Sequence, residues 1–139
     1  MNIMEVKFSA KSENESLARV IVASFAAKLD PTIDELSDIK TAVSEAVTNA
    51  IIHGYEEDET KFVHMRCELI ENTIKIVIED YGKGIADIEE ARQPMFTSKP
   101  ELERSGMGFS FMESFMDDMQ VASIVGEGTK VIMTKTIEI

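Results

Sequence analysis

The sequence contains little cysteine and few basic residues, and each shortage excludes a class of protein. Its single cysteine, Cys67, excludes an internal disulfide and a cysteine-rich zinc site, and we expect this residue in the core. Only 14 Lys and Arg residues stand against 26 Asp and Glu, a net charge of −12. This balance argues against direct binding to nucleic acid or to anionic membranes, because both require a cationic protein surface.

Long hydrophobic runs and linkers are also missing. No stretch approaches about 18 apolar residues, so we expect no membrane span. The first ten residues include acidic Glu5 and no long apolar run, which argues against a signal peptide. The three prolines are scattered, and no internal repeat or low-complexity run occurs. We therefore expect one cytoplasmic domain, residues 1–139, long enough to bury a core.

The first predicted helix begins at Ser12, because Glu15 stands three positions on, at the capping-box spacing. Apolar residues extend beyond one stripe, so the helix is either enclosed in the core or shared with a partner. We expect Arg19 to be exposed and to contact protein partners, although an ordinary surface arginine is the alternative. The same excess of apolar surface predicts a homodimer. The residues predicted to share one face are Leu17, Val20, Ile21 and Phe25.

A second, longer helix is predicted from a capping box at Thr32 and Glu35 to about His53. His53 is interpreted as a structural residue of the helix end. Gly54 follows where a C-terminal glycine cap belongs.

Within this helix, Glu45 and Asn49 are four residues apart and lie on one face. A carboxylate and a carboxamide side by side can serve as a general base and as an oxygen ligand for Mg²⁺. The alternative is the solvated polar edge of an amphipathic helix.

The remaining elements predict an α+β fold. Alternation at 63–69 and 74–78 predicts a hairpin with one buried face. With a strand at the start of the chain, a helix from about Gly108 and a final hairpin, the order is β-α-α-β-β-loop-α-β-β. This order predicts a two-layer sandwich in which helices cover one face of a mixed β-sheet. Residues 81–105 are long for a connection and are interpreted as a lid over a functional site.

Two glycine motifs occur later in the chain than the two predicted helices. Asp80, Gly82 and Gly84 form a D-x-G-x-G motif directly after the most apolar strand. The carboxylate can accept a hydrogen bond from an amine, and the glycines allow a close approach of the backbone. A strand-terminating turn is the alternative. Gly106 and Gly108 open a helix, where free N–H groups and the helix dipole favour an anion.

The fourth motif, G-x-G-T ending at Thr129, reads by itself as a hairpin turn. Together and in this order, however, the four motifs resemble the ATP-binding domain shared by type II topoisomerases, heat-shock 90 chaperones, histidine kinases and MutL proteins. The resemblance covers about residues 32–137, and the chain has no P-loop motif. A bare domain of this size is most similar to the anti-sigma factor and serine-kinase branch, especially over residues 44–55.

The resemblance implies binding of ATP or ADP with Mg²⁺ and transfer of phosphate to a serine. Glu45 would take the proton from the serine hydroxyl, and Asn49 would hold Mg²⁺ against the phosphates. Asp80 would accept a hydrogen bond from the adenine amino group. The residues lining the adenine and phosphate parts of the pocket would be Gly82, Gly84, Gly106, Gly108 and Thr129.

Phosphoryl transfer depends on charge neutralisation, so an acidic chain must supply local cations. Arg104 is expected to reach the γ-phosphate and to act catalytically, with Lys99 as a second candidate. Ser105 and Ser110 are expected to add hydroxyl contacts. A solvated charge on the lid is the alternative for Arg104.

The resemblance also implies two protein partners. The domain would bind and inhibit a sporulation sigma factor, and it would phosphorylate and thereby release an anti-anti-sigma factor. A nucleotide-gated binding module without phosphotransfer is the alternative, and a structural domain with an unused pocket is a third.

Overall fold

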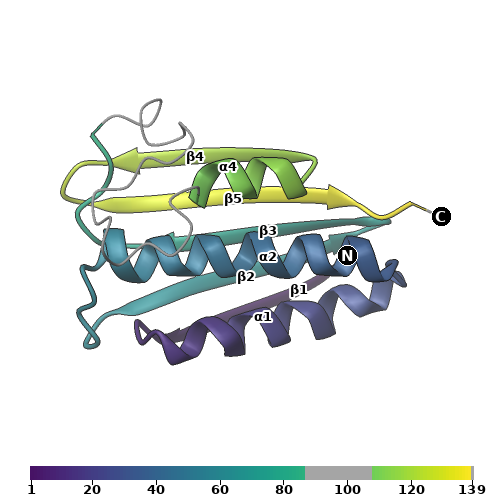
Figure 1. Cartoon of the computed structure of the whole chain (residues 1–139), viewed down its shortest axis with the longest axis horizontal. Helices are drawn as coiled ribbons and strands as arrows, with labels where there is room; N and C mark the ends of the chain where they lie inside the picture. Colours follow the sequence, from purple (N-terminus) through teal and green to yellow (C-terminus); the bar gives the residue numbers. More distant parts are fainter. Residues whose placement is uncertain (87–107, 139) are drawn as a thin grey trace.

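The computed structural model of the chain describes residues 1–86 and 108–138. In this part of the chain, helices lie across one face of a five-stranded sheet, which confirms the predicted two-layer α+β sandwich (Figure 1). No helix among the described residues is long and apolar enough to cross a membrane. The elements are β1 (Asn2–Ser9), α1 (Glu13–Ala26), η1 (Ala27–Leu29), α2 (Ile33–Asn49), η2 (Ala50–Gly54), β2 (Phe62–Ile70), β3 (Thr73–Asp80), α4 (Gly108–Phe115), β4 (Asp118–Ile124) and β5 (Gly128–Thr136).

The sheet has the strand order β1-β2-β3-β5-β4, and all four neighbouring pairs are antiparallel. The prediction of a mixed sheet was therefore wrong in this respect. Parallel neighbours arise when one helix returns the chain between two strands. Here two helices, α1 and α2, connect β1 to β2, and they run in opposite directions (Figure 1). The second helix adds one more reversal, so β2 enters the sheet antiparallel to β1.

The predicted alternation in β2 and β3 is confirmed. One face of each strand is buried under the helices, while the residues between are partly exposed. Cys67 is fully buried on this face, and burial raises the pKa of its thiol to about 12, so it is a core residue. Each large aliphatic side chain buried here contributes about 1.5–3 kcal/mol. The buried residues of the two strands are Val63, Met65, Cys67, Leu69, Ile74, Ile76 and Ile78.

Helix α1 differs from its sequence prediction in its cap and in its buried face. Ser12 has helical backbone angles and its side chain makes no cap hydrogen bond. Leu17 and Val20 were predicted to share the core face with Phe25, but they are 48% and 60% exposed. The buried stripe instead runs through Ala18, Val22, Phe25 and Ala26. Alanine contributes little to a hydrophobic pattern, yet its small side chain lets α1 pack closely on its neighbours.

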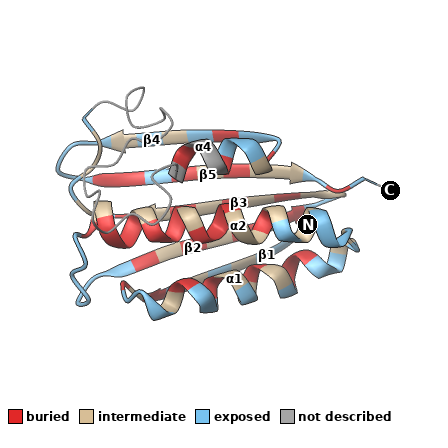
Figure 2. Ribbon diagram, viewed as in Figure 1, coloured by how far each residue is buried: buried red, intermediate tan, exposed pale blue. Residues whose placement is uncertain are grey.

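Helix α2 is buried over much of its C-terminal half (Figure 2). Its predicted capping box is present: Thr32 Oγ1 accepts from Glu35 N at 3.1 Å, and Glu35 Oε1 accepts from Thr32 N at 2.9 Å. The second carboxylate oxygen of Glu35 accepts from Glu138 N at 3.1 Å. These backbone donors, that of Thr32 first, lower the pKa of Glu35.

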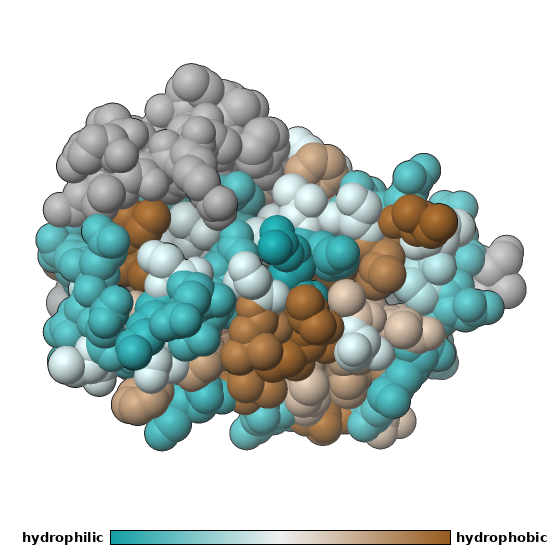
Figure 3. All heavy atoms as spheres, turned by 60° about the horizontal axis from the view of Figure 1, so that its bottom comes forward, coloured by the Kyte–Doolittle hydropathy of each residue, from teal (hydrophilic) through white to brown (hydrophobic). Residues whose placement is uncertain are grey.

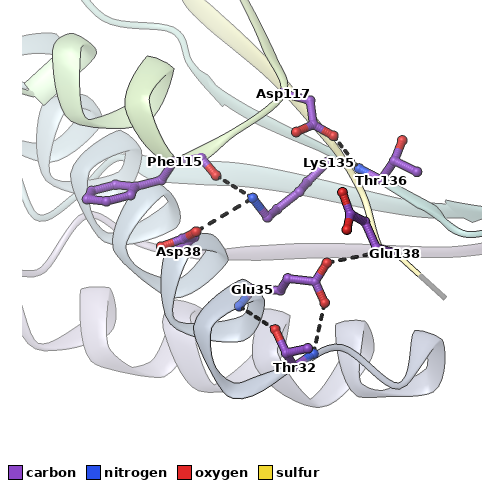
Figure 4. Close-up of polar contacts among 8 residues, drawn as sticks. All are labelled: Thr32, Glu35, Asp38, Phe115, Asp117, Lys135, Thr136 and Glu138. Atoms are coloured by element: carbon purple, nitrogen blue, oxygen red, sulfur yellow. Dashed lines mark hydrogen bonds and ion pairs between the residues drawn. The ribbon is translucent and has the colours of Figure 1, made fainter.

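A partly buried lysine completes the connection between the two layers at this end (Figure 4). Lys135 Nζ on β5 donates to the carbonyl oxygen of Phe115 at 2.8 Å, where α4 ends. The same nitrogen lies 3.6 Å from Asp38 Oδ2 on α2. Nearby, Asp117 accepts a hydrogen bond from the backbone N–H of Thr136 at 2.7 Å. The end of α4 is therefore fixed to both α2 and β5.

Candidate functional site

Asp80 is a buried carboxylate at the end of β3. Its residue is only 5% exposed. Gly82 N donates to Asp80 Oδ1 at 2.9 Å, and the backbone N–H of Thr129 donates a second hydrogen bond. Burial nevertheless outweighs these donors and raises the pKa of Asp80 to about 6. Such a carboxylate, fixed by the backbone and removed from bulk water, is suited to accept a hydrogen bond from an N–H group of a ligand.

Glycines surround this carboxylate because no side chain fits there. A Cβ at Gly54 would lie 2.6 Å from the carboxyl group of Asp80. A Cβ at Gly82 would lie 2.0 Å from the carbonyl oxygen of Gly54, and one at Gly128 would lie 2.1 Å from that of Asp80. Gly54 and Gly82 therefore lie against the carboxyl group of Asp80 and Gly128 lies against its main chain, so three backbone segments pack closely around this one residue.

Gly54 was assigned the wrong role by the sequence analysis. It is not a helix cap with left-handed backbone angles. It is the last residue of the π-helical turn η2 (Ala50–Gly54) and is not among the glycines with positive φ. The turn after the helix also includes His53, at the helix end as predicted. Gly54 is required because its backbone touches Asp80, a contact 26 residues apart in sequence. No local sequence signal links two residues that are so far apart in the chain.

The second half of the D-x-G-x-G motif packs against the hairpin formed by β4 and β5. Gly84 has φ of +77°, and a Cβ there would lie 2.4 Å from the carbonyl oxygen of Ile124. Ile85 N donates to Ser123 Oγ at 2.7 Å, and this hydroxyl lies 2.8 Å from Thr129 Oγ1. Thr129 itself is paired with Asp80 in the β3–β5 register. The structure thus brings the second and fourth sequence motifs together.

Tyr55 is a component of the site that the sequence analysis missed. Its ring is buried, and its hydroxyl donates to the carbonyl oxygen of Phe62 at 2.6 Å. The same hydroxyl accepts from the backbone N–H of Tyr81 at 2.8 Å. Burial is the main cause that raises the pKa of this phenol. The only available signal was its position directly after Gly54, at the end of a polar motif.

Glu45 and Asn49 lie on α2, one turn apart and partly buried, as their spacing predicted. The Oε2 atom of Glu45 is removed from solvent. Since η2 carries the chain directly from Asn49 to Gly54, this pair lies at the same end of the molecule as Asp80. Asn49 offers one amide oxygen, which suits Mg²⁺ because this ion usually combines few protein ligands with water and phosphate oxygens.

Several predicted residues fall outside the described part of the chain: Lys99, Arg104, Ser105 and Gly106. Gly108 is described as the first residue of α4, as predicted. Along that helix the predicted stripe of Phe109, Met112 and Met116 is buried. The predicted nucleotide contacts of all these residues stay predictions.

Arg19 lies away from this site, on α1. Its side chain is 40% exposed and its Nη2 lies 3.9 Å from Glu15 Oε2, four residues earlier. It is therefore accessible in part, and its cation is not buried.

The comparisons with known proteins agree with the fold and the motifs. A family model described as "Histidine kinase-like ATPase domain" matches residues 8–135, so the chain belongs to the histidine kinase-like ATPase domain family. A crystal structure of the RsbU and RsbW domains of a Mycobacterium tuberculosis protein superposes with a TM-score of 0.71 at 16% identity. That match covers 99% of this chain and 32% of the other. The mycobacterial sensor histidine kinase MprB gives a TM-score of 0.58 at 20% identity, over 74% of this chain and 72% of that one.

Within that class, sequence similarity is much closer to one group. The chain is 63% identical over 134 residues to the anti-sigma F factor of Clostridium perfringens strain SM101, covering 96% of both chains. It is 60% identical to the anti-sigma F factor of Anoxybacillus flavithermus, covering 96% of this chain and 92% of the relative. The anti-sigma F factor of Clostridium novyi is 53% identical over 99% of this chain and 96% of its own length. The chain is thus a member of the anti-sigma F factor family.

Proposed function

We propose that this protein is an anti-sigma factor that binds and inhibits a sporulation sigma factor, sigma F. The observation that carries this proposal is the 63% identity, over almost the whole of both chains, to a relative named for that function. Inhibition of a sigma factor would take place in the cytoplasm, where RNA polymerase works.

The proposal includes ATP or ADP, with Mg²⁺, as the bound nucleotide. It is supported by the buried carboxylate of Asp80, which can accept a hydrogen bond from an amino group, and by the glycines that let the backbone pack closely around it. Gly82, Gly84 and Thr129 would shape the adenine end of the pocket. Asn49 would hold the metal, which neutralises phosphate charge when bound.

The phosphate end of the site is proposed to lie between α2 and the start of α4. Helix α4 begins at Gly108, and the N-terminal end of a helix favours an anion; Gly106 precedes it in sequence. Arg104 and Lys99 would supply cations, and Ser105 a hydroxyl, to the triphosphate.

The proposed activity is that of a protein-serine kinase that phosphorylates and inactivates an anti-anti-sigma factor. Glu45 would take the proton from the acceptor serine hydroxyl while the serine oxygen bonds to the γ-phosphorus and ADP leaves. A carboxylate on a rigid, buried helix, one turn from the metal ligand Asn49, supports this role.

The exposed face of α1 is proposed as a surface for protein partners and for a homodimer. Leu17 and Val20 are exposed beside Arg19. In the view that brings this side of the molecule forward, hydrophobic side chains gather in an area framed by hydrophilic ones (Figure 3). Arg19→Ala should weaken binding to at least one of the two partners, and unchanged affinity for both would exclude the role of Arg19. A mass that stays monomeric at all concentrations in analytical ultracentrifugation would exclude the dimer.

The kinase is tested by comparing Glu45→Gln with the wild type. Calorimetric titration should show that both proteins bind ATP and Mg²⁺, while transfer of labelled phosphate to the anti-anti-sigma factor falls at least about a hundredfold in the variant. Normal transfer by the variant would exclude Glu45 as the base. If the wild type binds ATP and both partners but transfers no phosphate, the protein is the nucleotide-gated binding module instead.

A further inference from the structure

We propose that Tyr55 is a positioning residue of the nucleotide site. Its hydroxyl holds the end of β3 at the distance from β2 at which Asp80 meets the amino group of adenine. This inference rests on the proposed nucleotide-binding function. Tyr55 would thus fix the preference for adenine without touching the nucleotide.

The Tyr55 hydroxyl stands in the sheet where a ladder hydrogen bond is expected. The β2–β3 register pairs His64 with Glu79, and continuing it by two residues places Phe62 opposite Tyr81. Instead of a direct bond between Tyr81 N and the Phe62 carbonyl, the hydroxyl lies between them, at 2.8 Å from the nitrogen and 2.6 Å from the oxygen. The phenol therefore spaces the two strands apart while it satisfies both backbone groups.

The residue before Tyr55 fixes the other side of the same loop. The carbonyl oxygen of Gly54 accepts from Lys83 N at 3.0 Å. The two neighbours Gly54 and Tyr55 thus bind the backbone at Tyr81 and at Lys83, on both sides of Gly82, which itself donates to Asp80. The carboxylate is oriented by a loop whose position is set from the end of α2.

The π-helical turn η2 explains how the chain presents both residues. Its wider turn accommodates an additional residue between α2 and the loop, a feature frequently found at functional sites. The five residues Ala50–Gly54 lead from Asn49, the proposed metal ligand, to Gly54, which packs against the carboxylate of Asp80. The next residue, Tyr55, attaches this turn to the sheet through the two hydrogen bonds of its hydroxyl.

Tyr55→Phe is the test, because it keeps the buried ring and removes only the hydroxyl. The matched control is Thr73→Val, which keeps a β-branched side chain and removes a hydroxyl that lies 2.9 Å from Thr136 Oγ1 at the opposite end of β3. Two ligands are titrated with Mg²⁺: ATP, and purine riboside triphosphate, which lacks the 6-amino group. Thermal melting confirms that each variant is folded.

We expect Tyr55→Phe to weaken ATP binding about tenfold, the loss of about one well-oriented hydrogen bond. Its affinity for the analogue should stay within about twofold of the wild type, so the preference for adenine falls. Thr73→Val should keep both affinities. A merely structural role would lower both affinities together.

The outcomes separate this inference from the function on which it rests. If the wild type binds no ATP, the proposed function fails. If the wild type prefers ATP over the analogue and Tyr55→Phe keeps that preference, or loses both ligands equally, only the positioning role of Tyr55 is overturned.

Discussion

Asp80 is expected to destabilise the ligand-free protein at neutral pH, since its negative charge is buried before any ligand arrives. The perturbation that exposes this cost is Asp80→Asn, which removes the charge and keeps an oxygen acceptor of the same shape. The amide oxygen can still accept from Gly82 N. The variant should therefore be more stable than the wild type at neutral pH, although it lacks the carboxylate proposed to bind adenine.

The magnitude follows from the pKa of Asp80. Burial raises it from an ordinary value of 3.8 to about 6, so the folded state binds this proton more tightly than the unfolded state. The difference between these two values corresponds to about 3 kcal/mol. Since the folded pKa is raised, the stabilising contribution is fully present below pH 3.8 and is lost as the pH rises through about 6.

Urea denaturation of the ligand-free proteins at two pH values measures this effect. At pH about 7.5 the variant should exceed the wild type in free energy of unfolding by up to about 3 kcal/mol. At pH about 4.5 that advantage should have fallen by about 2 kcal/mol. Comparison at each pH cancels the titration of the other acidic residues. An equal stability at both pH values, or a difference independent of pH, would refute the reasoning.

Two further substitutions test the packing around the site and the polar connection at the other end of the sheet. Gly54→Ala places a methyl carbon 2.6 Å from the buried carboxylate and should weaken ATP binding at least about tenfold by calorimetry. Gly126→Ala strains a backbone with φ of +84° and lowers stability, but its added methyl meets nothing within 4 Å, so it should keep the ATP affinity; an equal loss of affinity in both variants would contradict the steric argument. Lys135→Met leaves the Phe115 carbonyl without its 2.8 Å donor and should lower the free energy of unfolding by about 1–3 kcal/mol in urea. Lys130→Met, at a more exposed ion pair, should change it by less than about 0.5 kcal/mol, and a similar effect of both variants would exclude the Lys135–Phe115 hydrogen bond as the cause.

Much of the fold and the order of the site motifs could be predicted because their signals are local. A strand with one buried face needs alternating residues, as in β2 and β3, and a helix start needs a cap such as Thr32 with Glu35. The helical spacing that places Glu45 and Asn49 on one face is likewise fixed by the helix itself.

The face of α1 could not be predicted in the same way. A helix that is apolar on more than one side has several possible core faces, and the choice depends on what it packs against. The neighbouring elements bury Ala18 and Ala26 and leave Leu17 and Val20 exposed, although the latter pair is far more hydrophobic. Close packing selected small side chains, which a hydrophobic pattern does not register.

The sequence by itself therefore determined the elements, the family and the residues of the four motifs. Only the tertiary structure decided how these motifs meet, because contacts such as Gly54 with Asp80, or Tyr55 with Tyr81, join segments 26 residues apart. The direction of β2 against β1 was decided at that level too, by the two helices between them. Local propensity acts within a few residues, whereas the close approach of two backbones is set by the packing of the whole domain.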